Sequence, residues 1–264
     1  MDHRGQGVLV TGASSGIGAA FARALAERGA NVLLVARSLP KLEALATELR
    51  ERYGVRAEAL PADLREAGAG ARLLAEAARR KFSVDLLINN AGLGSYGPFE
   101  TVSDERVAEQ IAVNVASLVE LTHAFLPAMI ARGTGGIINV ASTAAFQPVP
   151  YMAVYAATKA FVLSFSEALW AENRARGVRV LALCPGATET GFFDAVGTQE
   201  ASVGKREPAS VVVARALRAL DGRRSYLVSG RANFWTAQLA RLLPRAKLAS
   251  LTARIMRPRQ LKAA

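Results

Sequence analysis

The feature that most constrains this chain is a regular alternation of short apolar runs with segments of helical spacing. The apolar runs are VLVTG, NVLLVA, VRAEALPA, VDLLINNAG, GGIINVAS and VRVLALCPG. They show no polar alternation, which favours strands covered on both faces. The helical segments between them are residues 17–28, 40–53, 67–81, 104–132 and 154–176. This alternation predicts an α/β fold: a single doubly wound Rossmann-type domain, with a parallel sheet of about seven strands and helices on both faces.

Composition agrees with one large globular domain. The chain has 264 residues, of which 51% are hydrophobic and 21% charged, and a chain this long buries roughly three quarters of its unfolded surface. Its single cysteine, Cys184, excludes an intramolecular disulfide. Because the N-terminus lacks a signal-peptide pattern and no apolar run has membrane-spanning length, the expected location is the cytoplasm.

The net charge of +11 is concentrated at the C-terminal end. Residues 230–264 contain eight basic residues and no acidic ones, which leaves 25 basic against 22 acidic residues elsewhere. Apolar residues recur among these basic ones at near-helical spacing, and Pro244 and Pro258 interrupt them. We therefore predict two parts: a Rossmann-fold domain over residues 1–229, and a basic amphipathic helical extension over residues 230–264.

A glycine-rich turn follows the first predicted strand. The segment Thr11-Gly12-Ala13-Ser14-Ser15-Gly16-Ile17-Gly18 opens the first predicted helix. Glycine permits positive φ angles and close approach of a ligand to the backbone, and the free N–H groups of a helix start can face a pyrophosphate. The spacing is one residue wider than the usual dinucleotide fingerprint. Its position after an N-terminal strand nevertheless predicts a dinucleotide site.

The end of the second predicted strand indicates which dinucleotide binds. NAD-binding Rossmann folds place a carboxylate there to accept a hydrogen bond from the ribose 2′-hydroxyl. This chain instead reads Val35-Ala36-Arg37-Ser38, with no carboxylate. A planar guanidinium suits a 2′-phosphate. Arg37 therefore predicts NADP(H) as the cofactor, although an ordinary surface arginine is the alternative.

Tyr155 and Lys159 lie four residues apart in a predicted helix, so they share one face. A phenol is a poor base at neutral pH, but a nearby ammonium stabilises the phenolate and lowers the pKa. Ser142 follows a predicted strand where open α/β sheets bind ligands, and can orient a substrate oxygen. Asn114 lies inside a predicted helix, where asparagine is unfavourable, so we expect it to hold a water or accompany a kink.

The ordered set of motifs TGASSGIG, Asp63, NNAG, Asn114, Ser142, YAATK and PGATET closely resembles the single-domain, NADP-preferring branch of the short-chain dehydrogenase/reductase family. The resemblance covers residues 7–228. It implies an enzyme that transfers a hydride between a nicotinamide and a carbonyl or alcohol. It also implies a homodimer or homotetramer formed through the long helices around Asn114 and Tyr155.

The resemblance implies roles for individual residues. Tyr155 would act as the general acid/base, Lys159 would bind the nicotinamide ribose and lower the tyrosine pKa, Ser142 would bind the substrate oxygen, and Asn114 would help to hold a water in the proton relay. Tyr155 and Lys159 also count among the expected cofactor contacts. The other positions expected to contact the cofactor are Gly12, Ser14, Ser15, Gly16, Ile17, Gly18, Arg37, Asp63, Leu64, Asn90, Ala91, Gly92, Pro185, Gly186, Thr188 and Thr190.

Other chemistry is disfavoured. The chain has two histidines and one cysteine, which makes a zinc site improbable, and no metal is expected. Cys184 has no histidine nearby in the sequence and is expected to pack rather than react. Substrate specificity is expected in residues 93–100, 143–152 and 188–206, whose aromatic and apolar residues predict a pocket for an apolar ketone or keto-acyl compound.

The basic tail leaves alternatives open. It can pack its apolar side on the domain or on a neighbouring subunit, which we favour, or lie as an amphipathic helix on an anionic membrane. Nucleic-acid binding is not expected, because no reading motif accompanies the charge. The functional alternatives to a soluble reductase are a non-catalytic NADP(H) sensor and a peripheral membrane reductase of lipid carbonyls.

Overall fold

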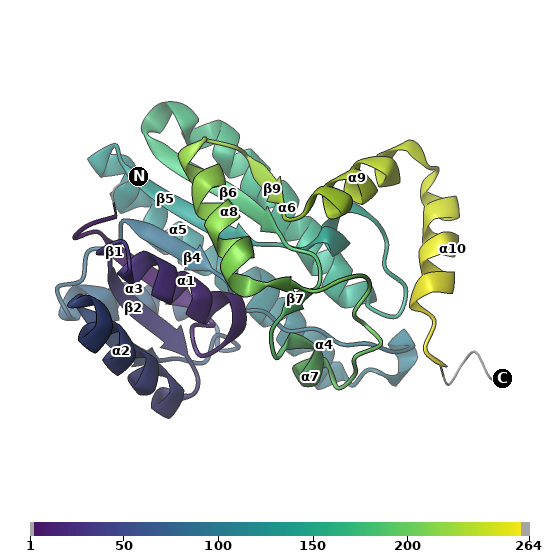
Figure 1. Ribbon diagram of the computed structural model, residues 1–264, viewed down its shortest axis with the longest axis horizontal. Coiled ribbons are helices and arrows are strands. Elements are labelled where there is room, and N and C mark those ends of the chain that lie inside the picture. The colour runs from purple at the N-terminus through teal and green to yellow at the C-terminus, as the bar shows by residue number, and fades with distance from the viewer. Residues whose placement is uncertain (1–2, 260–264) are drawn as a thin grey trace.

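Seven parallel strands form the central sheet (Figure 1). The computed structural model describes residues 3–259. Residues 1–2 lie outside the described part, as do residues 260–264, which belong to the predicted extension. The strand order is β3-β2-β1-β4-β5-β6-β9. The strands are β1 (Gly7–Thr11), β2 (Asn31–Ala36), β3 (Ala57–Pro61), β4 (Leu86–Asn89), β5 (Gly135–Val140), β6 (Val178–Cys184) and β9 (Tyr226–Val228). The predicted α/β fold and doubly wound sheet are confirmed.

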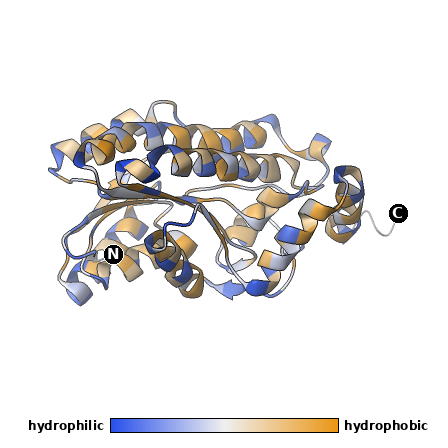
Figure 2. Ribbon diagram, turned by 90° about the horizontal axis from the view of Figure 1, so that it is seen from above, coloured by the Kyte–Doolittle hydropathy of each residue, from blue (hydrophilic) through white to orange (hydrophobic). Residues whose placement is uncertain are grey.

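Two layers of helices enclose the sheet, which Figure 2 shows edge-on between them. One layer contains α1 (Gly16–Ala26), α2 (Leu39–Tyr53) and α8 (Ala209–Asp221). The other contains α3 (Ala69–Arg79), α5 (Ser117–Arg132) and α6 (Ala153–Asn173). All six strand segments and five helical segments expected from the sequence are present, with ends shifted by a few residues.

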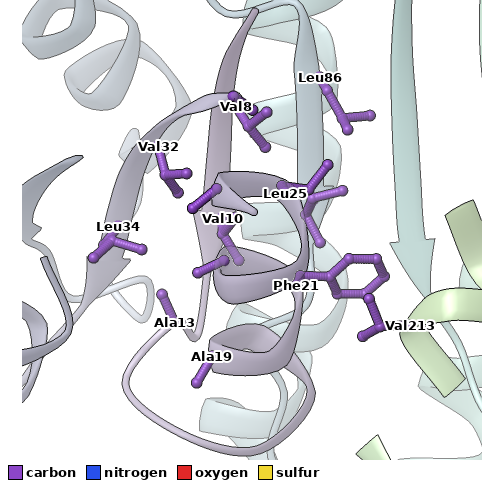
Figure 3. Packing of buried hydrophobic residues seen from close by; sticks show 14 of the residues in the cluster. Val8, Val10, Ala13, Ala19, Phe21, Leu25, Val32, Leu34, Leu86 and Val213 are labelled. Atoms are coloured by element: carbon purple, nitrogen blue, oxygen red, sulfur yellow. The ribbon is translucent and has the colours of Figure 1, made fainter. Parts of the chain in front are cut away.

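Alternate residues of each strand pack against the two helix layers, because successive side chains of a strand point to opposite faces of the sheet. On β1, Val8 and Val10 pack with Phe21 of α1, whereas Leu9 packs with Phe125 of α5. Figure 3 shows the first of these clusters. Burial on both faces explains why the strands read as continuous apolar runs.

The sequence predicted one helix over residues 104–132, and the structure divides it. α4 (Asp104–Ile111) begins after Ser103, whose side chain accepts a hydrogen bond from the Arg106 N–H. A single π-helical turn, Ala112–Ala116, then leads into α5. By length and composition the run Asp104–Arg132 could cross a membrane, so the expectation that no apolar run has that length was wrong. In the folded protein 44% of its apolar window is buried.

Beyond the sheet, the chain ends in two helices at one side of the molecule (Figure 1). These are α9 (Arg231–Leu239) and α10 (Arg245–Met256), joined through a short 3₁₀ turn. Pro244 directly precedes α10, as the sequence pattern suggested. The Tyr96 hydroxyl donates to the Met256 carbonyl at 2.8 Å, and the Thr252 hydroxyl to the Pro148 carbonyl at 3.0 Å. α10 is therefore fastened to loops at the carboxyl end of the sheet.

Candidate active site

A cavity of about 800 Å³ lies at the carboxyl ends of the strands, where open α/β sheets bind ligands. It extends across β1 and β4, between which the strand order reverses. The predicted residues that line it are Gly12, Ser14, Ser15, Gly16, Ile17, Arg37, Asp63, Leu64, Asn90, Ala91, Gly92, Ser142, Tyr155, Lys159, Pro185, Gly186, Thr188 and Thr190. The predicted residues Gly18 and Asn114 do not line it.

The glycine-rich turn has the backbone conformation that glycine allows. Gly12 has a φ of +63° and Gly16 a φ of +54°. At Gly18 a Cβ would meet the Gly12 carbonyl oxygen at 2.3 Å, so this glycine permits α1 to pack against the turn. Ser15 stands at the N-cap of α1, and its side chain makes no capping hydrogen bond. The start of α1 thus offers backbone N–H groups and a free hydroxyl to an anion in the cavity.

The NNAG segment holds this turn in place. The Asn90 side-chain amide donates to the carbonyls of Thr11 at 2.9 Å and Gly12 at 3.3 Å. The Thr11 hydroxyl accepts hydrogen bonds from the backbone N–H groups of Asn90 and Ala91, at 3.0 and 3.1 Å. Asn90 therefore shapes the cradle that a pyrophosphate would occupy.

Charged residues line the end of the cavity that lies beside β2 and β3. Arg37 is exposed directly after β2, and within residues 3–259 no ion pair holds its guanidinium. Lys41 lines the cavity close by, a cation that sequence reasoning missed although it lies four residues after Arg37. The Asp63 carboxylate accepts from Arg65 at 2.6 Å, and this guanidinium keeps the pKa of Asp63 low. Two cations beside this cavity, neither of which forms an ion pair with a residue in the described part of the chain, suit a dianionic phosphate.

Tyr155 and Lys159 lie on successive turns of α6, as predicted. The Lys159 Nζ lies 5.7 Å from the centroid of the Tyr155 ring and donates to the Val140 carbonyl at 2.8 Å. Ser142, two residues after β5 ends, hydrogen bonds with the phenol of Tyr155 and also accepts from the Ala144 N–H at 3.1 Å. Hydroxyl, phenol and ammonium thus meet at the wall of the cavity.

Burial dominates the electrostatics of this cluster. Burial raises the pKa of Tyr155, and the Ser142 hydrogen bond offsets only part of that effect. Burial also lowers the pKa of Lys159 to about 8. In the protein alone, therefore, the lowering of the tyrosine pKa that we expected from Lys159 does not appear as a net effect. The phenol stays protonated at neutral pH, which is the form that donates a proton.

Asn114 occupies the π-helical turn, in agreement with the expected kink. Its side-chain oxygen accepts from the Leu93 N–H at 2.8 Å, and its amide donates to the Leu93 carbonyl at 2.9 Å and to the Thr158 hydroxyl at 3.0 Å. These bonds join the loop after β4 to α6. Asn114 thereby fixes the distance between the two sides of the cavity, and π turns of this kind often occur at functional sites.

The model of the family described as short chain dehydrogenase matches residues 6–201. The chain belongs to the short-chain dehydrogenase family. The protein named oxidoreductase UcpA, of Escherichia coli strain K12, is 36% identical to this chain over 221 residues, which cover 83% of this chain and 82% of that protein.

Two further comparisons agree. The very-long-chain 3-oxoacyl-CoA reductase of Anas platyrhynchos is 35% identical over 185 residues, 69% of this chain but only 59% of that enzyme. The solved structure of a short-chain dehydrogenase from Sphingobium yanoikuyae in complex with NADPH has a TM-score of 0.81 at 35% identity, and covers 90% of this chain and 94% of that one. The fold of this chain thus matches that of a solved short-chain dehydrogenase.

The part of the cavity beside Tyr155 is lined by apolar residues. Phe192, on the short helix α7 (Phe192–Val196), packs against Tyr155 with ring centroids 5.4 Å apart. The other lining residues that the three predicted segments contributed include Val149, Met152 and Phe193. Phe99, in contrast, is 60% exposed, and Phe146 packs against Tyr226 with ring centroids 6.0 Å apart.

Sequence reasoning missed the outer wall of the pocket. Thr252, Ile255 and Met256 of α10 line the cavity, as does Thr236 of α9. These residues fall after residue 201, where the match to the short-chain dehydrogenase family model ends. The near-helical apolar spacing of the tail was the one available signal, and it showed that a helix exists without showing what it covers.

Cys184 ends β6 and is fully buried among Ala141, Val162 and Ala182. Burial raises the pKa of its thiol, so the thiolate needed for nucleophilic attack does not form at neutral pH. This cysteine packs, as expected.

Proposed function

We propose that the protein is an NADP(H)-dependent oxidoreductase that transfers a hydride between the nicotinamide and an apolar carbonyl or alcohol. One observation carries this proposal: the cluster of Ser142, Tyr155 and Lys159 lies where the glycine-rich cradle and the apolar pocket meet in one cavity. An acid/base between a dinucleotide cradle and an apolar pocket suits a reaction that combines a hydride and a proton.

The residues of the cavity fit this cofactor. At Gly12 and Gly16 a Cβ would come within 3 Å of Asn90 and Thr190, so glycine is required for the tight turn. A turn without side chains suits close approach of a pyrophosphate to the backbone. Arg37 and Lys41 suit the 2′-phosphate that distinguishes NADP(H). The NADPH-bound relative from Sphingobium yanoikuyae supports the same choice.

The chain's own residues would then handle the proton. When bound, NADPH supplies the hydride that adds to the carbonyl carbon. The Ser142 hydroxyl holds the carbonyl oxygen, and Tyr155 donates its proton to that oxygen as negative charge develops. The Lys159 ammonium stabilises the phenolate left behind. Alcohol oxidation reverses these steps.

The pocket favours a substrate with an apolar body. Val149, Met152, Phe192 and Phe193 surround the approach to Tyr155. The names of relatives, which include a very-long-chain 3-oxoacyl-CoA reductase, agree with a keto-acyl compound or a comparable ketone. We propose a cytoplasmic enzyme and a homodimer or homotetramer, in which exposed Ile111 and Phe161 on α4 and α6 contact a second copy. The division at residue 229 also remains a proposal.

The deciding experiment follows NADPH oxidation with a panel of aliphatic and aromatic ketones and keto-acyl compounds. Tyr155→Phe removes the proton donor and is expected to lower kcat by at least about a hundredfold, while NADPH still binds. Tyr151→Phe, which alters a nearby phenol that does not line the cavity, serves as the matched control.

Equal turnover by the wild type and Tyr155→Phe would contradict the assigned role of the phenol. Tight NADPH binding with no turnover of any ketone, and none of alcohols with NADP⁺, would instead favour the non-catalytic sensor. A peripheral membrane reductase remains compatible with the proposed chemistry and depends on the tail.

A further inference from the structure

The outer sides of α9 and α10 carry large apolar residues that the fold leaves uncovered. Trp235 is 63% exposed, Leu239 58% and Leu242 78%, and their spacing of four and three residues places them along one side of the chain. On α10, Leu251 and Ile255 are also exposed. We call these five residues the apolar face. Contiguous exposed apolar residues usually mark an interaction site.

Packing on the body does not account for this face. α9 and α10 already bury other residues inward, among them Ala237, Leu248 and Met256. Hydrogen bonds from Thr252 and Tyr96 hold α10 in that orientation. The helices thus have a satisfied inner side and a second, unpartnered apolar side.

The same segment carries basic residues as well as the apolar face. Arg231, Arg245, Lys247, Arg254 and Arg257 are all exposed. Within the described part of the tail no carboxylate belongs to the segment, and none of these five side chains forms an ion pair with a residue between 3 and 259. A shallow depression on α10 is lined by Lys247, Leu251 and Arg254 together, so charged and apolar side chains share the same surface.

A second copy of the chain is a poor occupant for this surface. Two-fold contacts bring the same patch of both subunits together, and here that would place basic residues against basic residues. An anionic bilayer instead complements both features, since headgroups attract Lys and Arg while the acyl boundary accepts apolar side chains. Tryptophan is favoured at that boundary, which suits Trp235.

We propose that the outer side of α9 and α10 is a docking surface for bilayers that contain anionic lipids. The mouth of the cavity lies beside it, because Ile255 both lines the cavity and is more than half exposed. Docking would therefore bring the pocket close to the headgroup boundary. A carbonyl compound dissolved in the bilayer could then reach Tyr155 with a short path through water, which is a consequence that rests on the proposed function.

Flotation of the full chain with vesicles tests the docking surface without any assay of turnover. Wild type should float with vesicles of phosphatidylcholine and 30% phosphatidylglycerol, and stay behind with pure phosphatidylcholine. The triple variant Arg245→Glu/Lys247→Glu/Arg254→Glu should bind at least about tenfold more weakly. Trp235 emission should shift to shorter wavelength on binding in the wild type.

A matched control separates local charge from overall charge. Arg28→Glu/Arg52→Glu/Lys81→Glu alters three exposed basic residues outside the tail by the same total charge, and should float like the wild type. Circular dichroism and NADPH turnover in detergent-free buffer check that both triple variants remain folded, so loss of docking and loss of the proposed reaction are read separately.

Three results would overturn the proposal: absence of wild-type flotation with anionic vesicles, equal loss of binding in both triple variants, or unchanged binding after Arg245, Lys247 and Arg254 are reversed. Wild type that does not float, but forms a dimer abolished by Trp235→Ser/Leu239→Ser/Leu242→Ser in light scattering, would show that the face covers a second copy instead.

Discussion

At the scale of single residues, burial acts on the two ends of the proton-handling cluster in opposite senses. It raises the pKa of the Tyr155 phenol and lowers the pKa of the Lys159 ammonium to about 8. Since a base with a lowered pKa loses its proton at lower pH, Lys159 carries its charge below about pH 8 and loses it above. Tyr155 remains protonated throughout the pH range in which Lys159 loses its charge, because its own pKa is raised.

This predicts a pH dependence. The kcat/KM for NADPH in ketone reduction should be constant from pH 6 to about 7.5 and fall as pH rises through about 8, because this quantity reports ionisations of the free enzyme. Steady-state kinetics from pH 6 to 10 measure it. Lys159→Arg keeps its charge and should move the fall to higher pH. A wild-type profile that stays flat to pH 10 would contradict the assignment.

Arg37 gives a second prediction at this scale. A charge-assisted hydrogen bond to the 2′-phosphate is worth about 1.5–3 kcal/mol, so the wild type should bind NADPH about 10- to 100-fold more tightly than NADH. Arg37→Asp should reverse this preference, because it repels the phosphate and accepts from a ribose hydroxyl. Fluorescence titration measures both affinities, with Arg52→Asp as the control. Equal affinity of the wild type for the two cofactors would remove Arg37 from this role.

At the scale of elements, the apolar periodicity of the sequence predicted most of the strands and helices. Strands buried on both faces and helices with one apolar side leave strong patterns, so β1 to β6 and the main helices were predictable. The break at Ala112–Ala116 was signalled only by Asn114, because a π turn changes the hydrogen bonding of a helix without changing its apolar period.

The candidate site was also predictable in part. Its cradle and its acid/base cluster lie in ordered motifs at strand ends, where neighbouring parallel strands bring distant residues together. The wall formed by α10 was not predictable, since its contacts with Tyr96 and Pro148 join residues more than 100 positions apart in the sequence. Spacing along a helix says which residues share a side, but not what they cover.

Substitution of Met256 tests whether α10 forms a wall of the substrate pocket. Its side chain is buried and lines the cavity, so Met256→Ala should enlarge the pocket and raise kcat/KM for bulky ketones relative to small ones, by several-fold. The lost packing should cost about 2 kcal/mol of unfolding free energy, at the low end for a buried methionine. Leu239→Ala, in the exposed part of the tail, is the control. An unchanged ratio of bulky to small ketones would mean that α10 does not limit the substrate.

At the scale of the whole molecule, cofactor binding and stability are linked. The cavity is lined by residues at or directly after the carboxyl ends of β1 to β6, so only the folded chain can bind NADPH with high affinity. NADPH at one hundred times its Kd should therefore add about 2.7 kcal/mol to the unfolding free energy.

Denaturant titration with and without NADPH measures this gain. Tyr155→Phe should retain it, because the phenol serves chemistry more than binding, whereas Arg37→Asp should lose most of it at the same NADPH concentration. An equal gain in all three proteins would show that the 2′-phosphate is not read by Arg37.

α10 follows every other cavity-lining element in the sequence, and this sets the order in which the parts of the cavity are synthesised. The glycine-rich turn and Lys159 are synthesised well before Met256, which completes the wall of the cavity. During synthesis, the glycine-rich turn and Tyr155 can therefore come together while the side of the cavity that α10 covers is still open to water. Recombination that exchanges only residues 230–264 would therefore give the same cavity a new outer wall and the protein a new outer surface in a single event.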